Sequence, residues 1–330
     1  MQIGNIKVDN PLFLGPMAGV TDWAFRTICA ELGAGVTVTE MVSSRALVYQ
    51  DKKSKALLKK NEGSICGAQI FGNDPAIMAQ GAQLALEISG CDFLDINMGC
   101  PVTKVVKANA GSALMKDEEH AVKMVSEIIK NVKKPVTVKM RIGWDSDSKN
   151  CVSLAKKLES VGVSAIAVHG RTKKQMYEGK ADWSYIKLVK EAVHIPVIGN
   201  GDIRSVEDMI KMLETTGCDM VMIGRGILGD PWLIQRCVQY LETGEISNET
   251  SVEEKFKLAY NHAVSLCELK SERVGMKEMR SHAAWYMKSL KYSHRVKDLV
   301  SNMSTLDEFK MILDNYKNSL ENDDWQWLER

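Results

Sequence analysis

The chain has 330 residues, of which 45% are hydrophobic and 26% are charged, and this composition excludes extensive disorder. Its formal net charge of +1 argues against global electrostatic attraction to nucleic acid, so any RNA site must be a local patch. A β/α barrel takes about 250 residues, and the remaining length is sufficient for one further small domain.

Membrane, metal and disulfide signals are missing from the sequence. No stretch approaches the ~18 consecutive apolar residues of a membrane span, and the N-terminus lacks a basic segment followed by a long apolar run. The eight cysteines form no CxxC pair and no His/Cys ligand pattern. We therefore expect a cytoplasmic protein without membrane contact, metal site or disulfide framework, with most cysteines in the core.

Eight short apolar runs, many of them β-branched, predict eight strands. In chain order they cover residues 12–17, 35–41, 65–71, 93–98, 136–142, 165–169, 197–200 and 220–223. Helical periodicity between them predicts helices that include 76–88, 118–129, 152–161 and 206–213. Asp74, Asp117 and Ser205 stand where N-caps are expected.

Apolar strands that alternate with amphipathic helices predict a parallel sheet covered by helices, and eight repeats favour a closed (β/α)8 TIM barrel. An open Rossmann-like sheet is the alternative, but no GxGxxG follows the first strand. Beyond a linker at 242–245, the sequence predicts four helices at 252–266, 277–290, 297–301 and 306–320. We expect a catalytic barrel over residues 1–242 and a small all-α helical bundle over 243–330.

Polar residues stand at the ends of the expected strands, where a β/α barrel carries its active site. They are Pro16-Met17-Ala18, Glu40, Gln69, Asn97 with Cys100, Lys139 with Arg141, His169 with Arg171, Asn200-Gly201-Asp202 and Gly224-Arg225. Any one of them is equally consistent with the start of a loop. Eight at equivalent positions favour a shared site.

Two features of these strand ends predict an anionic ligand. Glycines after the seventh and eighth strands let backbone N–H groups approach a phosphate, although they could also make only tight turns. Lys139 and Arg141 share one face of a strand, so we assign both to the ligand site; a solvated surface lysine is the alternative. A reduced flavin offers such a lysine a partner at its N1 edge.

Six ordered motifs resemble the tRNA-dihydrouridine synthases, with the closest similarity to the bacterial B-type subgroup. They are GPMAGVTDWAFR (15–26), DINMGCPVTKV (95–105), VTVKMRIGW (136–144), AVHGRT (167–172), VIGNGDI (197–203) and MIGRGILGDPW (222–232). The similarity extends over the whole chain and includes KEMRSHAAWYMKSL (277–290) in the helical tail.

The resemblance implies a flavin-dependent oxidoreductase that reduces uridines in the D-loop of tRNA to 5,6-dihydrouridine, with bound FMN and with NADPH as electron donor. It implies that Pro16, Met17 and Ala18 line the isoalloxazine ring, and that Gln69 and Lys139 bind its polar edge. Around the ribityl phosphate it implies His169, Asn200, Gly201, Asp202, Gly224 and Arg225. Asn97 and Arg171 resemble residues that orient the uracil.

Cys100 matches the proton donor of the family. Hydride addition at carbon 6 of uracil leaves enolate character that must be protonated at carbon 5, and a thiol of ordinary pKa ~8.5 suits that task. A buried, inert cysteine is the alternative.

The helical tail contains a local excess of positive charge. Between Lys270 and Lys297 there are eight basic and two acidic residues, with Trp285, Tyr286 and Tyr292 among them. We predict that Lys277, Arg280 and Lys288 contact tRNA, whose target base must swing out of its stack to reach a barrel mouth. A solvated helix with inward aromatics is the alternative.

Two other functions compete with this interpretation. One is a reductase of a small free pyrimidine, similar to dihydroorotate dehydrogenase, which would not need the basic tail. The other is an RNA-binding protein that has lost its chemistry, which the presence of Cys100 and Lys139 disfavours. We expect a monomer without an obligate protein partner.

Overall fold

The computed structural model describes residues 1–246 and 250–329. Two compact units divide the chain, Met1–Gly226 and Ile227–Arg330. The first unit ends earlier than residue 242, because the segment after Gly226 packs against the tail: a Cβ on Gly229 would lie 2.1 Å from the carbonyl oxygen of Trp285. The assignment of separate functions to the two parts stays a prediction.

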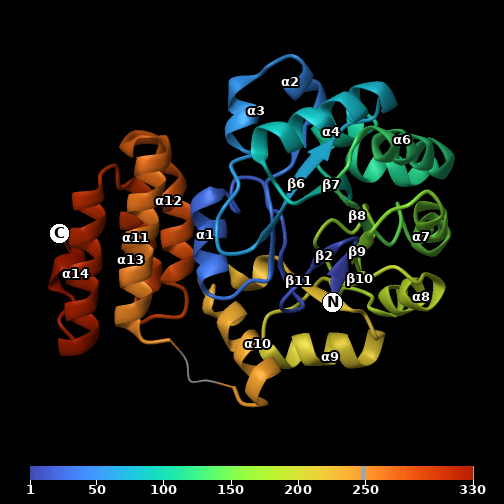
Figure 1. Ribbon diagram of the computed structural model, residues 1–330. Coiled ribbons are helices and arrows are strands. Elements are labelled where there is room, and N and C mark those ends of the chain that lie inside the picture. The colour runs from blue at the N-terminus through green and yellow to red at the C-terminus, as the bar shows by residue number, and fades with distance from the viewer. Residues whose placement is uncertain (247–249, 330) are drawn as a thin grey trace. The chain divides into compact units, whose positions relative to one another are not determined.

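The first unit is a closed barrel of parallel strands, as predicted (Figure 1). Each strand pairs in parallel with the next, and the last pairs with the first, which excludes the open sheet. The strands are β3 (Leu12–Leu14), β4 (Val36–Val38), β6 (Ile65–Phe71), β7 (Phe93–Met98), β8 (Val136–Arg141), β9 (Ala165–His169), β10 (Val197–Asn200) and β11 (Met220–Ile223).

The second predicted strand is interrupted. β4 ends at Val38, and β5 (Val42–Ser43) resumes the parallel pairing with β6 after a break. Within the break, the hydroxyl of Thr39 accepts a hydrogen bond from the backbone N–H of Gln69, so a side chain replaces a ladder contact. The break places Glu40 outside the regular pleat, at the carboxyl end of β4.

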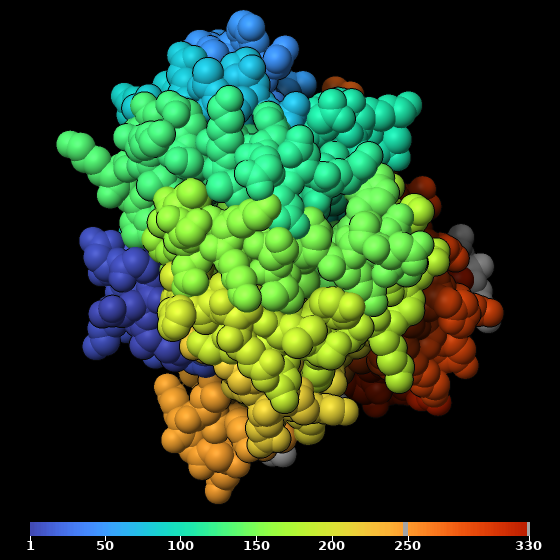
Figure 2. Space-filling view, turned by 90° about the vertical axis from the view of Figure 1, so that its right-hand side faces the viewer, coloured from blue at the N-terminus to red at the C-terminus, as the bar shows by residue number. Residues whose placement is uncertain are grey.

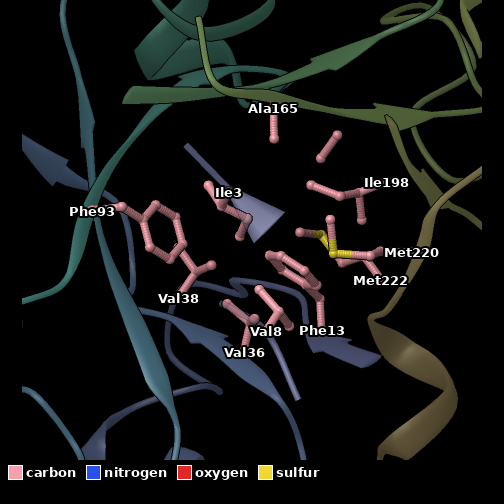
Figure 3. Packing of buried hydrophobic residues seen from close by; sticks show 11 residues of the cluster. Ile3, Val8, Phe13, Val36, Val38, Phe93, Ala165, Ile198, Met220 and Met222 are labelled. Atoms are coloured by element: carbon pink, nitrogen blue, oxygen red, sulfur yellow. The ribbon is translucent and has the colours of Figure 1, made fainter. Parts of the chain in front are cut away.

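A short hairpin that the sequence analysis did not predict contributes to the core of the barrel. It consists of β1 (Gln2–Ile3) and β2 (Ile6–Lys7). Ile3 is fully buried and packs in a cluster with Phe13, Phe93 and Ile198 from three different strands (Figure 3). Burial of such a side chain stabilises the fold by about 1.5–3 kcal/mol.

Helices surround the barrel, and several begin at the predicted caps. Asp74, Asp117 and Ser205 each accept a hydrogen bond from a backbone N–H in the first turn of their helix. The longer helices are α1 (Trp23–Glu31), α4 (Pro75–Ser89), α6 (Glu118–Asn131), α7 (Cys151–Ser160), α8 (Ser184–Ala192) and α9 (Val206–Thr216). Figure 2 looks onto the green to yellow face that includes neighbouring helices α6, α7 and α8.

Shorter helices follow the second and fourth barrel strands. They are α2 (Ser44–Val48), α3 (Lys52–Ala56), α5 (Thr103–Lys107) and the 3-10 helix η1 (Gly111–Lys116). The last two fill the long interval between β7 and β8, where the sequence left room for an insertion. The eight cysteines are free thiols. Seven of them are buried, in agreement with the prediction that most lie in the core.

The second unit is helical, as predicted. It contains α10 (Trp232–Thr243), α11 (Val252–Lys270), α12 (Glu272–Tyr286), α13 (Ser293–Asn302) and α14 (Leu306–Asn322). The predicted linker begins too early, because Glu242 and Thr243 still belong to α10 and the helix ends at Gly244 with φ of 75°. Tyr286 is buried, Trp285 is half-buried and Tyr292 is exposed.

Among residues 1–246 and 250–329, no helix combines the length and apolar character needed to cross a membrane. In the same ranges, no group of three or more His, Cys, Asp or Glu side chains is placed to hold a metal ion.

Candidate active site

The predicted polar residues end neighbouring parallel strands, so they meet at the carboxyl end of the barrel. Gln69, Asn97 and Lys139 lie on β6, β7 and β8, and His169 and Asn200 end β9 and β10. Hydrogen bonds join Asn97 to Gln69 and Lys139 to Asn200 directly. This end is the one at which β/α barrels carry their active sites.

Cys100 lies in a hydrogen-bonded turn directly after β7. The side-chain oxygen of Asn97 accepts from the backbone N–H groups of Gly99 at 3.1 Å and Cys100 at 2.8 Å. From the other side, the hydroxyl of Ser112 donates to the carbonyl oxygen of Cys100 at 2.9 Å. The turn is thus fixed at both ends, and the Cys100 side chain packs beside Phe71 and is 8% exposed.

Burial raises the pKa of the Cys100 thiol above its ordinary value, although the backbone of Val102 and the charges of Arg141 and Lys139 oppose the rise. The group is therefore a protonated thiol at neutral pH. A thiol in this state can donate a proton, whereas a nucleophilic cysteine would need a lowered pKa.

The amide of Asn97 continues a chain of polar contacts into the barrel. Its nitrogen donates to the side-chain oxygen of Gln69 at 2.8 Å, and the nitrogen of Gln69 donates to Asp95 at 2.6 Å. Asp95 is buried and was not among the predicted site residues. Alternation along β7 could have found it, because Asp95 and Asn97 share one face of the strand.

Positive charge accumulates beside this chain. Burial, followed by the charges of Lys139, Arg141, Arg171 and Arg225, lowers the pKa of His169 well below its ordinary value. Burial and the neighbouring Arg141 lower the pKa of Lys139 to about 8. Such mutual repulsion among cations favours the binding of an anion between them.

Two of the predicted substrate ligands hold loops in place. Arg141 is 2% exposed and donates to the carbonyl oxygens of Gly99, Thr172 and Met176, which joins the Cys100 turn to the loop after β9. Arg171 is 1% exposed, and its donors go to loop carbonyls, to His169 and to the carboxylate of Asp202. Contact of either arginine with a substrate stays a prediction.

Tyr177, on the loop after β9, was also not predicted as a site residue. Its ring lies 4.5 Å from the Arg225 guanidinium carbon and 5.6 Å from that of Arg141. No sequence signal marks it, because the cation–π contacts form only when this loop folds over the strand ends.

The first barrel loop is fixed by the interrupted second strand. A carboxylate oxygen of Glu40 accepts from the backbone N–H of Gly19 at 2.5 Å, and the hydroxyl of Thr21 accepts from Met17 N–H at 2.8 Å. Pro16 and Met17 are half-buried and Ala18 is exposed, so this loop presents a surface at the mouth.

The loops after β10 and β11 have the properties of a phosphate cradle. In the part of the chain that the structure describes, the backbone N–H groups of Asp202, Gly224 and Arg225 donate to no loop or side-chain acceptor. A Cβ on Gly224 would enter open space, with Met17 Sδ as its nearest neighbour at 4.0 Å. Gly201 has φ of 125°, and a Cβ there would lie 2.8 Å from Ala181 Cβ. Backbone N–H groups next to glycines can approach a phosphate closely, because glycine has no side chain in the way.

Asn200 connects this cradle to the lysine. Its side-chain oxygen accepts from Lys139 Nζ at 3.1 Å, and its nitrogen donates to the carbonyl oxygen of Met222 at 2.8 Å. The lysine can only donate and the carbonyl can only accept. The orientation of the Asn200 amide is therefore defined.

The predicted tRNA contacts in the second unit differ in their availability. Lys277 and Lys288 are exposed. Arg280 is half-buried and donates to the carbonyl oxygens of Met303 and Asn302 at the end of α13, where it caps the helix. Arg280 therefore stabilises the end of α13, and its contact with RNA stays a prediction.

Residues 13–321 match the family model described as dihydrouridine synthase. The chain is 45% identical to tRNA-dihydrouridine synthase B of Vibrio vulnificus (strain CMCP6), over 87% of this chain and 89% of the relative. It is 42% identical to the probable tRNA-dihydrouridine synthase of Rickettsia conorii (strain ATCC VR-613 / Malish 7), over 92% of each chain.

Among solved structures, the fold is similar to 6-hydroxypseudooxynicotine amine oxidase from Pseudomonas geniculata N1, at 13% identity and a TM-score of 0.59. It is also similar to histamine dehydrogenase from Rhizobium sp. 4-9, at 12% identity and a TM-score of 0.59. The matches cover 98% of this chain but only 66% and 64% of those longer chains, so they bear on the fold alone.

Proposed function

Because this chain belongs to the dihydrouridine synthase family, we propose that it reduces uridines in the D-loop of tRNA to 5,6-dihydrouridine, with FMN as bound cofactor and NADPH as electron donor. The observation that carries the proposal is the Cys100 side chain, held in a hydrogen-bonded turn that Arg141 joins to the mouth of the barrel.

The residues at the mouth fit FMN. The N–H groups of Asp202, Gly224 and Arg225 suit the phosphate, and the nearby His169 adds a neutral donor. Lys139 suits the N1–O2 edge of the ring, where negative charge develops on reduction. Pro16, Met17 and Ala18 would support the ring, with Gln69 at its polar edge.

When bound, reduced FMN supplies the hydride that adds to carbon 6 of uracil. The chain supplies the proton: the Cys100 S–H bond breaks, a C–H bond forms at carbon 5, and the thiolate later regains a proton from water. Hydride and proton together are the two electrons and two hydrogens that the 5,6 double bond gains. The positive charges of Arg141 and Lys139 stabilise the transient thiolate.

Asn97, whose side-chain oxygen fixes the Cys100 turn, would orient the uracil against that thiol. A uridine stacked in folded tRNA reaches this position only after it swings out of the helix. Lys277 and Lys288 would then hold phosphates of the tRNA body. We place the protein in the cytoplasm, with its substrate, as a monomer.

Two measurements test this proposal. The purified protein should carry FMN, visible as yellow absorbance, and should oxidise NADPH in the presence of unmodified tRNA but not with free uridine. Dihydrouridine should disappear from defined tRNA positions in cells that lack the gene, and the parent gene should restore it. Unchanged dihydrouridine in those cells, or equal activity on free uridine, would contradict the proposal.

A further inference from the structure

Asp95 lies at the inner end of the polar chain that leads to Cys100. It is 4% exposed, and its two carboxylate oxygens accept hydrogen bonds from Gln69 Nε2 at 2.6 Å and from the Thr137 hydroxyl at 2.5 Å. Burial raises the pKa of Asp95, and these two bonds together with the charge of Lys139 oppose the rise. Both oxygens are thus engaged by neighbouring side chains.

A carboxylate that only accepts fixes the direction of every amide that follows it. Because Gln69 must present its nitrogen to Asp95, its oxygen is left for Asn97. Because Asn97 must present its nitrogen to Gln69, its oxygen is left for the N–H groups of Gly99 and Cys100. If either amide turned over, two donors or two acceptors would face each other.

We propose that Asp95 is a positioning residue that acts through Gln69 and Asn97 to hold the Cys100 turn in the geometry of proton donation. This inference rests on the proposed function for its catalytic consequence. The chain of contacts itself exists in the protein without cofactor or tRNA, so part of the inference is testable without either.

The substitution Asp95→Asn separates direction from volume. An asparagine has the same shape, but it offers one acceptor and one donor, and the donor would face either Gln69 or Thr137. The direction of the Gln69 amide is then no longer imposed. Asn97 loses its single orientation in turn, and the Cys100 turn opens more often.

The first test measures the thiol directly. Iodoacetamide is applied to the FMN-free parent and the Asp95→Asn variant, and alkylation of each cysteine is followed by mass spectrometry. We expect Cys100 to react about tenfold faster in the variant, as befits the loss of a buried hydrogen bond. The buried Cys29 and Cys151 serve as internal controls, and their rates should be unchanged if the barrel stays folded.

The second test separates proton donation from general damage. The FMN-loaded proteins are reduced with dithionite, and their reoxidation is followed once with tRNA and once with dioxygen. We expect Asp95→Asn to slow the tRNA reaction about 10²-fold, as misplacement of a reacting group does, while the dioxygen reaction stays at the parent rate. The matched control Asp219→Asn, which changes a carboxylate bound to Val197 N–H at the opposite end of β10, should leave both reactions unchanged.

A double exchange provides a rescue. In the variant that combines Gln69→Glu with Asp95→Asn, the asparagine donates to the glutamate, whose second oxygen again accepts from Asn97. The direction of the Asn97 amide is restored, and the tRNA reaction should recover at least about tenfold over Asp95→Asn.

The outcomes separate the two proposals. A parent protein that reduces no tRNA contradicts the proposed function, and the alkylation result still judges the role of Asp95. Equal alkylation of Cys100 in parent and variant, or an equal tRNA rate, overturns the positioning role. A variant that slows the dioxygen and tRNA reactions alike also overturns it.

Discussion

Arg171 Nη1 lies 3.3 Å from Nε2 of His169. A guanidinium offers only donors, so His169 must accept at Nε2 and carry its proton at Nδ1. Burial and the four surrounding cations also lower the pKa of His169, which favours the neutral ring. We expect His169 to be neutral at pH 6.5 and above, as the Nδ1–H tautomer, because its pKa lies below the ordinary histidine value. Imidazole ¹⁵N shifts at pH 6.5 test the prediction, and a protonated signal there would contradict it.

The ion pair of Arg171 with Asp202 should be a main support of the loop after β9. The buried guanidinium needs an anionic partner, and Arg171 Nη2 lies 2.8 Å from each carboxylate oxygen of Asp202. Substitution Arg171→Met should lower the free energy of unfolding of the FMN-free protein by about 1.5–3 kcal/mol, the range for loss of a hydrogen bond to a charged group, because Asp202 is partly exposed. Urea unfolding followed by tryptophan fluorescence measures the loss.

The same pair predicts a dependence of stability on acid. Burial acts to raise the pKa of Asp202, but the Ala181 N–H and the Arg171 guanidinium lower that pKa below its ordinary value. The stabilisation is therefore complete above about pH 4, the ordinary carboxyl pKa, and is lost as pH falls through the lowered value. Arg171→Met should lack this part of the acid sensitivity, and identical acid profiles would contradict the assignment.

Lys139 should make FMN affinity depend on alkaline pH. Its pKa is lowered to about 8 by burial and by Arg141, so the free protein loses this positive charge as pH rises through about 8. Affinity for an anionic ligand should then weaken by up to about tenfold per pH unit above that value. Flavin fluorescence quenching from pH 7 to 9.5 measures it. Lys139→Met should bind more weakly at pH 7 and show a flatter profile.

The strands and the helix caps of the barrel were predictable because their causes are local. Apolar runs bounded by Gly and Pro predicted both ends of β6, β7, β9, β10 and β11. The break after Val38 was not predictable, because the Thr39 hydroxyl replaces a ladder contact only when β6 lies beside it. The β1–β2 hairpin was missed because its two-residue strands are too short to show alternation.

The site was predictable in its members but less so in their roles. Strand-end position selected Arg141 and Arg171, yet their partners are main-chain carbonyls of loops, which no sequence pattern announces. Asp95 was overlooked inside a mostly apolar run, although its carboxylate directs two amides. A carboxylate on the inward face of a barrel strand is therefore a signal to read together with the strand-end residues.

The exposed lysines of the second unit should set the salt dependence of tRNA binding. Lys277 and Lys288 are free to contact phosphates, whereas Arg280 caps α13. The double variant Lys277→Ala/Lys288→Ala should weaken binding and reduce the slope of log affinity against log salt by roughly 1–2. As a control, Arg280→Ala should lower thermal stability through loss of the cap. An unchanged slope in the double variant would remove both lysines from the interface.

Cys100→Ala should slow the reduction of tRNA by roughly 10²–10⁴-fold, because it removes a general acid, while FMN content stays at the parent level. Cys100→Ser should be similarly slow, since a hydroxyl is a far weaker acid than a thiol.

Burial raises the pKa of the Cys100 thiol, so the parent rate should be level through neutral pH and fall only above the ordinary thiol value of ~8.5. That alkaline decline should be absent from Cys100→Ala. Single-turnover reoxidation of the reduced flavin by tRNA, measured from pH 6.5 to 10, provides both results. Cys151→Ala, which removes another buried thiol, is the matched control. A Cys100→Ala protein that reduces tRNA at the parent rate would show that the proton at carbon 5 comes from elsewhere.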